Sequence, residues 1–440
     1  MIKKTLHIKD TKKLLGAKPT LRCSVPEYLY LAMANARCNK AECFVKPGDH
    51  VLLNQVIGMR HAAFFDQPIH ATCSGEIVGF EKHYHRSGKM TEFVKIKNDF
   101  KDEKDPSYKE RSEEEIKNMS KEEMTEILKN CACVGLGGSS FPTYIKFQTK
   151  NPINTILIND IECEPYISSD HAVTLEETYR ILDGIRYLQW AFKCSKVMIC
   201  IKYVYKDLES ALNTALCNPK YKDTGIEVKK VGNFYPQGWE IAMIKSATGI
   251  TVPSGHLPSE FGIINFNVTS VIGIYYALKY NTPVHERRVT VTGDGIHSPS
   301  NFVVRIGTPV KTLLDACGGY KDEDKDKVII LGGPMMGASV PSDDCICTKT
   351  VTSIIVLNEQ NHGVEEPCVR CGSCALSCPV GLMPVEIMKT MQHAPVNMEK
   401  LKALKPQQCI GCGLCTYSCT SKIDVKKYVE TAKLIVSKVK

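Results

Sequence analysis

Cysteine is the residue type in this chain whose spacing most clearly indicates chemistry. Two blocks near the C-terminus repeat one pattern, with three thiols separated by two residues each and a fourth after three more. The first block comprises Cys368, Cys371, Cys374 and Cys378, and the second comprises Cys409, Cys412, Cys415 and Cys419. Thiolates in this spacing bind pairs of [4Fe–4S] clusters. The sequence therefore predicts two such clusters.

The spacing also predicts which block serves which cluster. Three closely spaced thiolates wrap one cluster, while the fourth cysteine of the run binds the other one, as in bacterial two-cluster ferredoxins. We expect one cluster on Cys368, Cys371, Cys374 and Cys419, and the other on Cys409, Cys412, Cys415 and Cys378. Two zinc sites are the alternative, because C-x-x-C pairs also bind zinc. Thr420 stands where the first block has Pro379, a change that removes no ligand.

A glycine-rich loop is the second chemical feature. Gly135, Gly137 and Gly138 lie in VGLGGSSFPTYIKF (134–147), and this run lets backbone N–H groups approach an anion. Pro142 suits the first turn of a helix, and Lys146 follows on the same face. The pattern is neither a P-loop nor the G-x-G-x-x-G of a Rossmann domain. A tight turn without a ligand is the alternative.

An acidic segment follows a buried strand soon afterwards. TILIND (155–160) reads as the strand, and Asn159, Asp160, Glu162 and Glu164 come at or after its end. Polar residues at the carboxyl ends of strands commonly bind ligands in α/β sheets, although a solvated loop gives the same pattern. The later runs 234–244 and 262–270 place further glycine, asparagine and acidic residues after β-like segments.

Composition restricts the class of protein. The chain has 440 residues, 21 cysteines and a net charge of +8, with 43% hydrophobic and 24% charged residues. It is therefore globular rather than disordered. No uncharged apolar run approaches the roughly 18 residues of a membrane-spanning helix, and the first residues lack a secretory signal. We expect a reducing compartment and free thiols. The charge is dispersed, which argues against nucleic acid as a partner.

Periodicity predicts several domains along the chain. Residues 47–58 and 68–81 read as two similar hairpins, and 101–123 as solvated helices with two capping boxes. Strand–helix alternation over 131–282 indicates an α/β layer. The predicted domains are a β-rich module (1–100), linker helices (101–123), an α/β domain (124–286), a small α+β module (287–345) and the cysteine-rich domain (346–440).

Taken together and in order, these motifs resemble the RnfC family, whose members belong to the Rnf electron-transport complex and are related to the flavin subunit of respiratory complex I. The resemblance rests on G-x-G-G-x-x-F-P-T, N-x-x-E-x-E-P, Y-P-Q-G-x-E, RIGTPV (305–310), GGPMMG (332–337) and the cysteine blocks. It implies an α/β multidomain fold: a barrel-sandwich hybrid module, an α/β FMN-binding domain, a β-grasp (SLBB-like) module and a ferredoxin-like domain for two [4Fe–4S] clusters.

The resemblance also implies a site for FMN and NADH. The residues that would line FMN are Gly135, Gly137, Gly138, Lys146, Asn159, Glu162, Gly238, Asn267 and Ser270. Phe141, Glu164 and Glu240 would lie towards the nicotinamide nucleotide. No side chain is required as a catalyst, because the cofactors supply the redox chemistry. The chain departs from the family at Ser139–Ser140, Trp239 and Thr269–Ser270.

These features predict a subunit that oxidises NADH through FMN and passes single electrons through two clusters to partner subunits of a membrane-bound, ion-translocating ferredoxin:NAD oxidoreductase. It would lie peripherally on the cytoplasmic face of the membrane. One alternative is a soluble relative that feeds a reductase in amino-acid fermentation or cobalamin reduction. The other is a non-enzymatic adaptor with two zinc sites.

Overall fold

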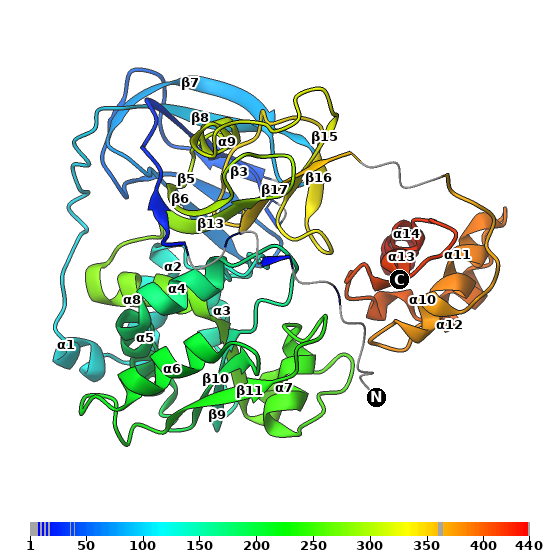
Figure 1. The fold of residues 1–440 in the computed structure, drawn as a ribbon. Helices are drawn as coiled ribbons and strands as arrows, with labels where there is room; N and C mark the ends of the chain where they lie inside the picture. The colour runs from blue at the N-terminus through cyan, green and yellow to red at the C-terminus, as the bar shows by residue number, and fades with distance from the viewer. Residues whose placement is uncertain are drawn as a thin grey trace.

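The computed structural model describes residues 8, 11–12, 15, 18–35, 37–38, 40–359 and 364–438. Figure 1 shows three parts: β-rich modules at the top, a layer of helices and strands below them, and a small helical domain at the right that carries the C-terminus. Among the described residues, no helix is both long enough and apolar enough to cross a membrane.

The N-terminal module is a sandwich of two antiparallel sheets. The four-stranded sheet has the order β2-β8-β7-β4, with β2 (Tyr28–Ala32), β8 (Met90–Asn98), β7 (Gly75–Tyr84) and β4 (His50–Val51). The three-stranded sheet has the order β3-β5-β6, with β3 (Lys40–Cys43), β5 (Val56–His61) and β6 (Asp66–His70). Fully buried residues from both sheets, such as Ile57 and Ile96, form one core. The expected barrel-sandwich architecture is confirmed.

The two predicted hairpins of this module are wrong in their pairing. The run 47–58 contributes β4 to one sheet and β5 to the other, and the run 68–81 divides between β6 and β7 in the same way. Apolar alternation predicts that a segment is a strand, but it does not specify the partner strand. Here each turn carries the chain across the sandwich instead of back along the same sheet.

Two short helices connect this module to the next domain. They are α1 (Glu113–Asn118) and α2 (Lys121–Asn130), and both begin with the predicted capping boxes, Ser112 with Glu115 and Ser120 with Glu123. In each box the serine hydroxyl accepts from the third helical N–H, and the glutamate accepts from the serine N–H. Met124 and Leu128 of α2 are fully buried in the core of the α/β domain. This helix therefore packs against that domain and is solvated on its outer face only.

The α/β domain is built on a parallel four-stranded sheet. Its order is β11-β10-β9-β12, with β11 (Ile226–Val231), β10 (Val197–Lys202), β9 (Thr155–Asp160) and β12 (Ile263–Asn267). The predicted strands at 155–160 and 196–203 are confirmed. Ile156 and Ile158 of β9 face one core and Leu157 the other, as the two-residue period of a strand requires.

Helices cover both faces of this sheet. One face carries α5 (Thr178–Phe192) and α8 (Val268–Tyr280), and the other carries α7 (Glu240–Thr248). The remaining helices of the domain are α3 (Thr143–Phe147), α4 (Ser169–Glu176), α6 (Lys206–Leu216) and the 3-10 turn η2 (Pro258–Phe261). The helix predicted at 176–192 is α5, which begins two residues later, after α4.

A six-stranded mixed sheet follows in the chain. Its order is β1-β14-β13-β17-β15-β16, with β1 (Leu21–Arg22), β14 (Ser300–Arg305), β13 (Glu286–Thr292), β17 (Ser353–Asn358), β15 (Lys327–Leu331) and β16 (Ala338–Val340). Helix α9 (Val310–Ala316) packs on it. The sequence prediction ended this module at residue 345. The structure corrects that boundary, because β17 pairs with both β13 and β15.

The C-terminal domain contains only helices and loops among its described residues. They are α10 (Ser373–Leu376), α11 (Pro384–Gln392), α12 (Met398–Ala403), η3 (Pro406–Gln408), α13 (Leu414–Tyr417) and α14 (Val425–Lys438). Their apolar faces meet in a small core that includes Ile387, Leu401 and Val429. Cysteines of both blocks border this core.

Candidate functional site

The strand order of the α/β sheet places a crevice at one edge. The chain runs from β9 to β10 and β11 on one side, and then returns to β12 on the other side of β9. Ligands bind outside the carboxyl ends of parallel strands where the order reverses in this way. Asn159 and the acidic segment end β9, and Asn267 ends β12. The structure therefore gathers these predicted site residues at one switch point.

The glycine loop lies against the same edge. The Leu136 N–H donates to the Ser270 hydroxyl at 2.8 Å, which fixes the loop to the start of α8. A side chain on Gly137 would approach the Asn267 side chain to 3.0 Å, so glycine is needed there for close packing. Ser270 and Asn267, both predicted to contact FMN, thus also hold the loop in place.

Asp170 is a site residue that sequence reasoning missed. Its carboxylate accepts hydrogen bonds from the Asn267 side chain at 2.7 Å and from the Thr269 hydroxyl at 2.6 Å. Burial and the nearby Glu162 raise the pKa of Asp170. It lies at the start of α4, outside every motif, so no local signal in the sequence marks it.

Three more predicted residues meet between β9, α3 and α7. Lys146 donates to the Asn265 carbonyl at 2.7 Å, and its Nζ lies 4.0 Å from the Glu240 carboxylate. Burial lowers the pKa of Lys146. Asn159 donates to the Gly238 carbonyl at 2.9 Å, which anchors the YPQG segment to the strand end. The positive Nζ and the amide are suited to a polar, anionic ligand.

The two glutamates of the acidic segment differ in their surroundings. Glu162 is saturated by the protein: it accepts from the Asp170 N–H at 2.8 Å and pairs with Lys12 at 3.3 Å. Glu164 accepts from the Met335 N–H at 3.1 Å, while its other oxygen has no partner among the described residues. Burial raises the pKa of Glu164 to about 7. Glu164 is therefore the one of the two that can still bind a ligand or a proton.

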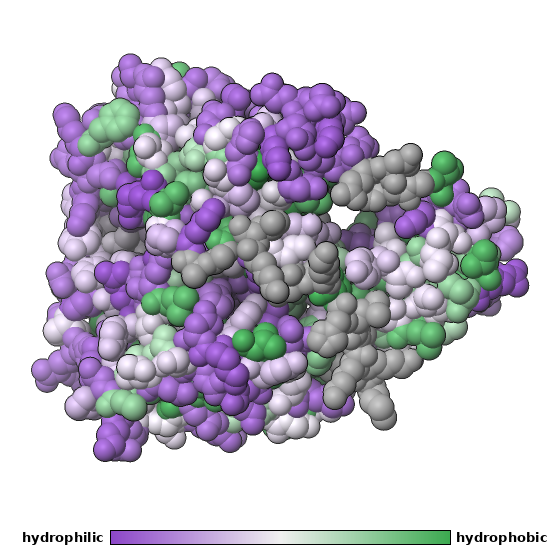
Figure 2. Space-filling view, in the orientation of Figure 1, coloured by the Kyte–Doolittle hydropathy of each residue, from purple (hydrophilic) through white to green (hydrophobic). Residues whose placement is uncertain are grey.

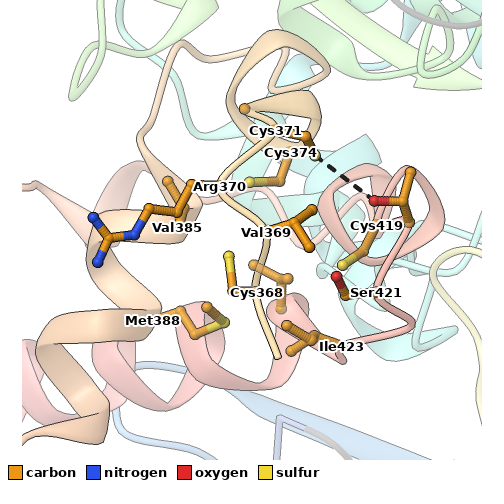
Figure 3. Close-up of a pocket in the computed structure, with 13 residues that line it drawn as sticks. Cys368, Val369, Arg370, Cys371, Cys374, Val385, Met388, Cys419, Ser421 and Ile423 are labelled. Atoms are coloured by element: carbon orange, nitrogen blue, oxygen red, sulfur yellow. Dashed lines mark hydrogen bonds between the residues drawn. The ribbon is translucent and has the colours of Figure 1, made fainter. Parts of the chain in front are cut away.

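The first cysteine cavity lies in the C-terminal domain. Its lining includes Cys368, Cys371, Cys374 and Cys419, three from the first block and one from the second. Figure 3 shows these side chains around a common space, with Ile423 and Met388 below. This grouping matches the set of four that the spacing predicts for one cluster.

The second cysteine cavity has the complementary lining. It includes Cys409, Cys412, Cys415 and Cys378, together with apolar residues such as Leu414 and Val429. Each cavity holds about 360 Å³ of empty space, its open mouth included. Among the described residues, no three His, Cys, Asp or Glu side chains converge closely enough to hold a single metal ion. Four thiols around a wide cavity therefore fit a polynuclear cluster better than a zinc ion.

The second cavity adjoins the α/β domain. Tyr235, which is 2% exposed, donates its hydroxyl hydrogen to the Cys412 carbonyl at 2.9 Å. Met335 packs with Tyr235, Cys412 and Leu414, and a side chain on Gly413 would come within 2.9 Å of the Met335 carbonyl. The YPQG and GGPMMG segments, far apart in sequence, thus meet the second cysteine block at one contact.

Four known domain families match successive parts of the chain. The family described as RnfC barrel sandwich hybrid domain matches residues 1–101, and the Nuo51 FMN-binding domain matches 128–276. The SLBB domain matches 288–339, and the 4Fe-4S dicluster domain matches 367–423. These matches confirm the predicted fold class and the predicted FMN and [4Fe–4S] cofactors.

Curated relatives match most of the chain. The RnfC-type subunit of the Na(+)-translocating ferredoxin:NAD(+) oxidoreductase complex of Acetobacterium woodii is 32% identical over 353 residues, which cover 79% of this chain and 78% of the relative. The chain belongs to the RnfC family of ion-translocating ferredoxin:NAD(+) oxidoreductase subunits. The corresponding subunit of the proton-translocating complex of Clostridium ljungdahlii is 31% identical, with 86% and 82% covered. The chain spans only 49% of the longer RnfC subunit of Vibrio cholerae, at 31% identity.

Solved structures share the fold at lower similarity. A crystal structure of NAD+-reducing [NiFe]-hydrogenase in the H2-reduced state aligns with a TM-score of 0.51 and 14% identity. The alignment covers 72% of this chain and 63% of that one. At this identity the likeness concerns the arrangement of the domains only.

Proposed function

We propose that this chain is the electron-input subunit of a ferredoxin:NAD oxidoreductase complex, with NADH as the electron donor. Its relatives are subunits of complexes named for that reaction. NADH delivers two electrons together, whereas a [4Fe–4S] cluster accepts one, and FMN supplies the chemistry that converts between the two. The chain's own residues bind, orient and shield these cofactors.

The observation that carries the proposal is the path from the crevice to the second cavity. Asn159 holds the Gly238 carbonyl, and Tyr235, three residues before Gly238, donates to the Cys412 carbonyl. Both hydrogen bonds lie in one short segment. The predicted FMN crevice and the second cysteine cavity are therefore neighbours, which supports Cys378, Cys409, Cys412 and Cys415 as ligands of the first electron acceptor after the flavin.

The remaining cavity would be the exit. Cys371 at its edge is exposed, and three large apolar side chains close to its cysteines in sequence are also exposed, Val369 at 68%, Leu376 at 71% and Tyr417 at 54%. In Figure 2 the small domain at the right shows several hydrophobic patches at its surface. We infer that the cluster on Cys368, Cys371, Cys374 and Cys419 passes electrons to a partner subunit, and that the chain lies peripherally on the cytoplasmic face of a membrane.

In the crevice, the proposed roles follow from the contacts. Gly135, Gly137, Gly138, Lys146, Asn159, Glu162, Gly238, Asn267 and Ser270 would surround FMN. Phe141, Glu164 and Glu240 would lie towards the nicotinamide nucleotide. Glu162 acts indirectly, because its carboxylate is already bound by Asp170 and Lys12.

Anaerobic purification with iron, sulfide and flavin counts, followed by titration with NADH, tests the proposal. We expect iron and sulfide for two clusters, one extractable FMN, and bleaching of both chromophores on addition of NADH. Two zinc ions without acid-labile sulfide would establish the adaptor instead. Co-purification with membrane subunits distinguishes the complex from a soluble electron-transfer relative.

A further inference from the structure

Three arginines from outside the α/β domain donate to carbonyls of the glycine loop. Arg287 of β13 donates to the Leu136 carbonyl at 3.3 Å, and Arg37 donates to the Ser139 carbonyl at 2.7 Å. Arg86, just after β7, reaches the Gly138 carbonyl at 3.5 Å. Two of these residues come from the sandwich module and one from the six-stranded sheet. The carbonyl side of the loop is therefore held from two neighbouring modules.

The peptide geometry turns this anchoring into an orientation of N–H groups. The peptide bonds of the loop are trans, because the cis bonds among the described residues lie elsewhere, at Tyr235–Pro236 and Ala394–Pro395. In a trans peptide the C=O and the following N–H point in opposite directions. Anchoring the carbonyls of Leu136 and Gly138 thus directs the N–H groups of Gly137 and Ser139 away from the arginines.

Those two N–H groups have no acceptor among the described residues, whereas their neighbours do. The Leu136 N–H donates to Ser270 at 2.8 Å, and the Ser140 N–H donates to the Gly135 carbonyl at 3.1 Å. Gly138 between them has a φ of 99°, a left-handed conformation that helps to form such a concave row of amides. Unpaired amides beside Asn267 and Ser270 are available to acceptor atoms of a ligand.

Arg86 and Arg287 also lack an acidic partner. Among the described residues no carboxylate oxygen lies within 4.0 Å of either guanidinium group, although Arg288, the next residue on β13, pairs with both Glu176 and Glu177. Arg287 is 4% exposed. Burial lowers the pKa of Arg287 to about 10, so it remains charged at neutral pH. Buried charges are normally paired, and this surplus of positive charge favours an anionic ligand on the opposite side of the loop.

We propose that Arg86 and Arg287, with a smaller contribution from the exposed Arg37, are positioning residues for FMN: they fix the carbonyl side of the glycine loop and thereby aim the Gly137 and Ser139 amides at negatively charged acceptor oxygens of the cofactor. This inference rests on the proposed flavin site. The acceptor oxygens belong either to the FMN phosphate or to the carbonyl edge of the isoalloxazine ring. The sandwich and β-grasp modules would thus complete the flavin site.

Flavin titration of the full-length, deflavinated chain tests the proposal. The variants are R86M, R287M and R37M, and the matched control is R288M, which removes a neighbouring arginine and its ion pairs but leaves the loop untouched. We expect FMN to bind about tenfold or more weakly to R86M and R287M, as for loss of a charged hydrogen bond, and R288M to bind as the wild type does. R37M should lose less, and R287K should recover part of the R287M loss.

A second readout separates positioning from general loosening. At saturating FMN and with the clusters oxidised, either the ³¹P resonance or the visible circular dichroism of the bound flavin should change in R86M and R287M but not in R288M. Riboflavin identifies the oxygens: an equal loss for both flavins assigns the ring, and a loss for FMN alone assigns the phosphate.

Two results would count against the inference, and they differ from failure of the flavin site itself. FMN affinities of R86M and R287M within twofold of the wild type would overturn it, as would weaker binding with both spectra unchanged. Absence of FMN binding by the wild-type chain would overturn the proposed function as well. Iron content and a cooperative thermal transition show that each variant is folded.

Discussion

The two cysteine blocks share one spacing but lie in different surroundings. The cavity with Cys412 is pressed against the α/β domain, where the Tyr235 hydroxyl contacts the cysteine's own carbonyl. The cavity with Cys371 opens towards solvent, and that cysteine is exposed. A duplicated motif therefore gives two cofactor sites with distinct positions along one route, an inner site beside the flavin crevice and an outer site beside a partner. The difference comes from tertiary contacts and not from the motif.

The largest effect is expected from removing one cysteine of each site. C412A should lose the inner cluster and about half of the iron, with the flavin still reduced by NADH but electron delivery to an acceptor reduced about 100-fold or more, since the relay is broken. C371A should also lose half of the iron, but it should leave the inner cluster reducible by NADH. Iron analysis and electron paramagnetic resonance after NADH addition measure both.

Cys217 provides the control for these variants, because it is exposed and lies outside both cavities. C217A should keep the full iron content and wild-type electron delivery. If C412A retained rapid reduction of the outer cluster by NADH, the proposed inner and outer positions would be reversed.

Glu164 supports the inner side of the comparison, and its protonation should affect stability. Burial raises the pKa of Glu164 to about 7, from 4.5 in the unfolded chain. Below pH 4.5 the carboxyl is protonated in both states; as the pH rises through 7, the folded chain loses up to about 3 kcal/mol because it must bury a carboxylate. E164Q should lack this loss.

Thermal unfolding at about pH 5 and about pH 8 measures this difference. The wild type should lose more stability than E164Q between the two conditions, and E114Q, at an exposed glutamate of α1, should follow the wild type. An identical pH response of E164Q and the wild type would show that the Glu164 carboxyl is not buried in its neutral form.

A smaller effect is expected from Y235F, which removes the hydrogen bond to the Cys412 carbonyl. Loss of one buried hydrogen bond should destabilise the chain by about 1 kcal/mol. It should also lower the potential of the inner cluster alone, because a donor beside a ligand favours the added electron. Redox titration monitored by electron paramagnetic resonance measures the shift. Y417F, at an exposed tyrosine of the C-terminal domain, should change neither quantity; equal shifts of both clusters in Y235F would disprove the local role.

The smallest effect concerns the position where the two blocks differ. The Thr420 hydroxyl lies 3.8 Å from the Cys371 sulfur, whereas Pro379 offers no such group to the other block (Figure 3). T420V should lower the potential of the outer cluster slightly and leave the inner one unchanged, because a weak hydrogen bond to sulfur is lost. T431V on the surface of α14 is the control. A shift confined to the inner cluster would contradict the assignment of Thr420 to the outer site.

Much of this molecule could be predicted from local patterns. The strand Thr155–Asp160, both capping boxes and the division of each cysteine block between two cavities follow from periodicity and spacing. Strand pairing could not be predicted, since alternation in 47–58 identifies a strand but not its partner. Asp170 and the three loop arginines were also missed, because they reach the site from distant segments and carry no motif of their own.

In the proposed route, electrons enter at the flavin crevice and leave through the outer cluster. Rapid freeze-quench electron paramagnetic resonance after anaerobic mixing with NADH tests this route most directly, with C371A and C412A used to assign the two cluster signals. We predict that the Cys412 cluster is reduced first and that the Cys371 cluster follows. Reduction of the Cys371 cluster first, or no reduction of either cluster by NADH, would contradict the route.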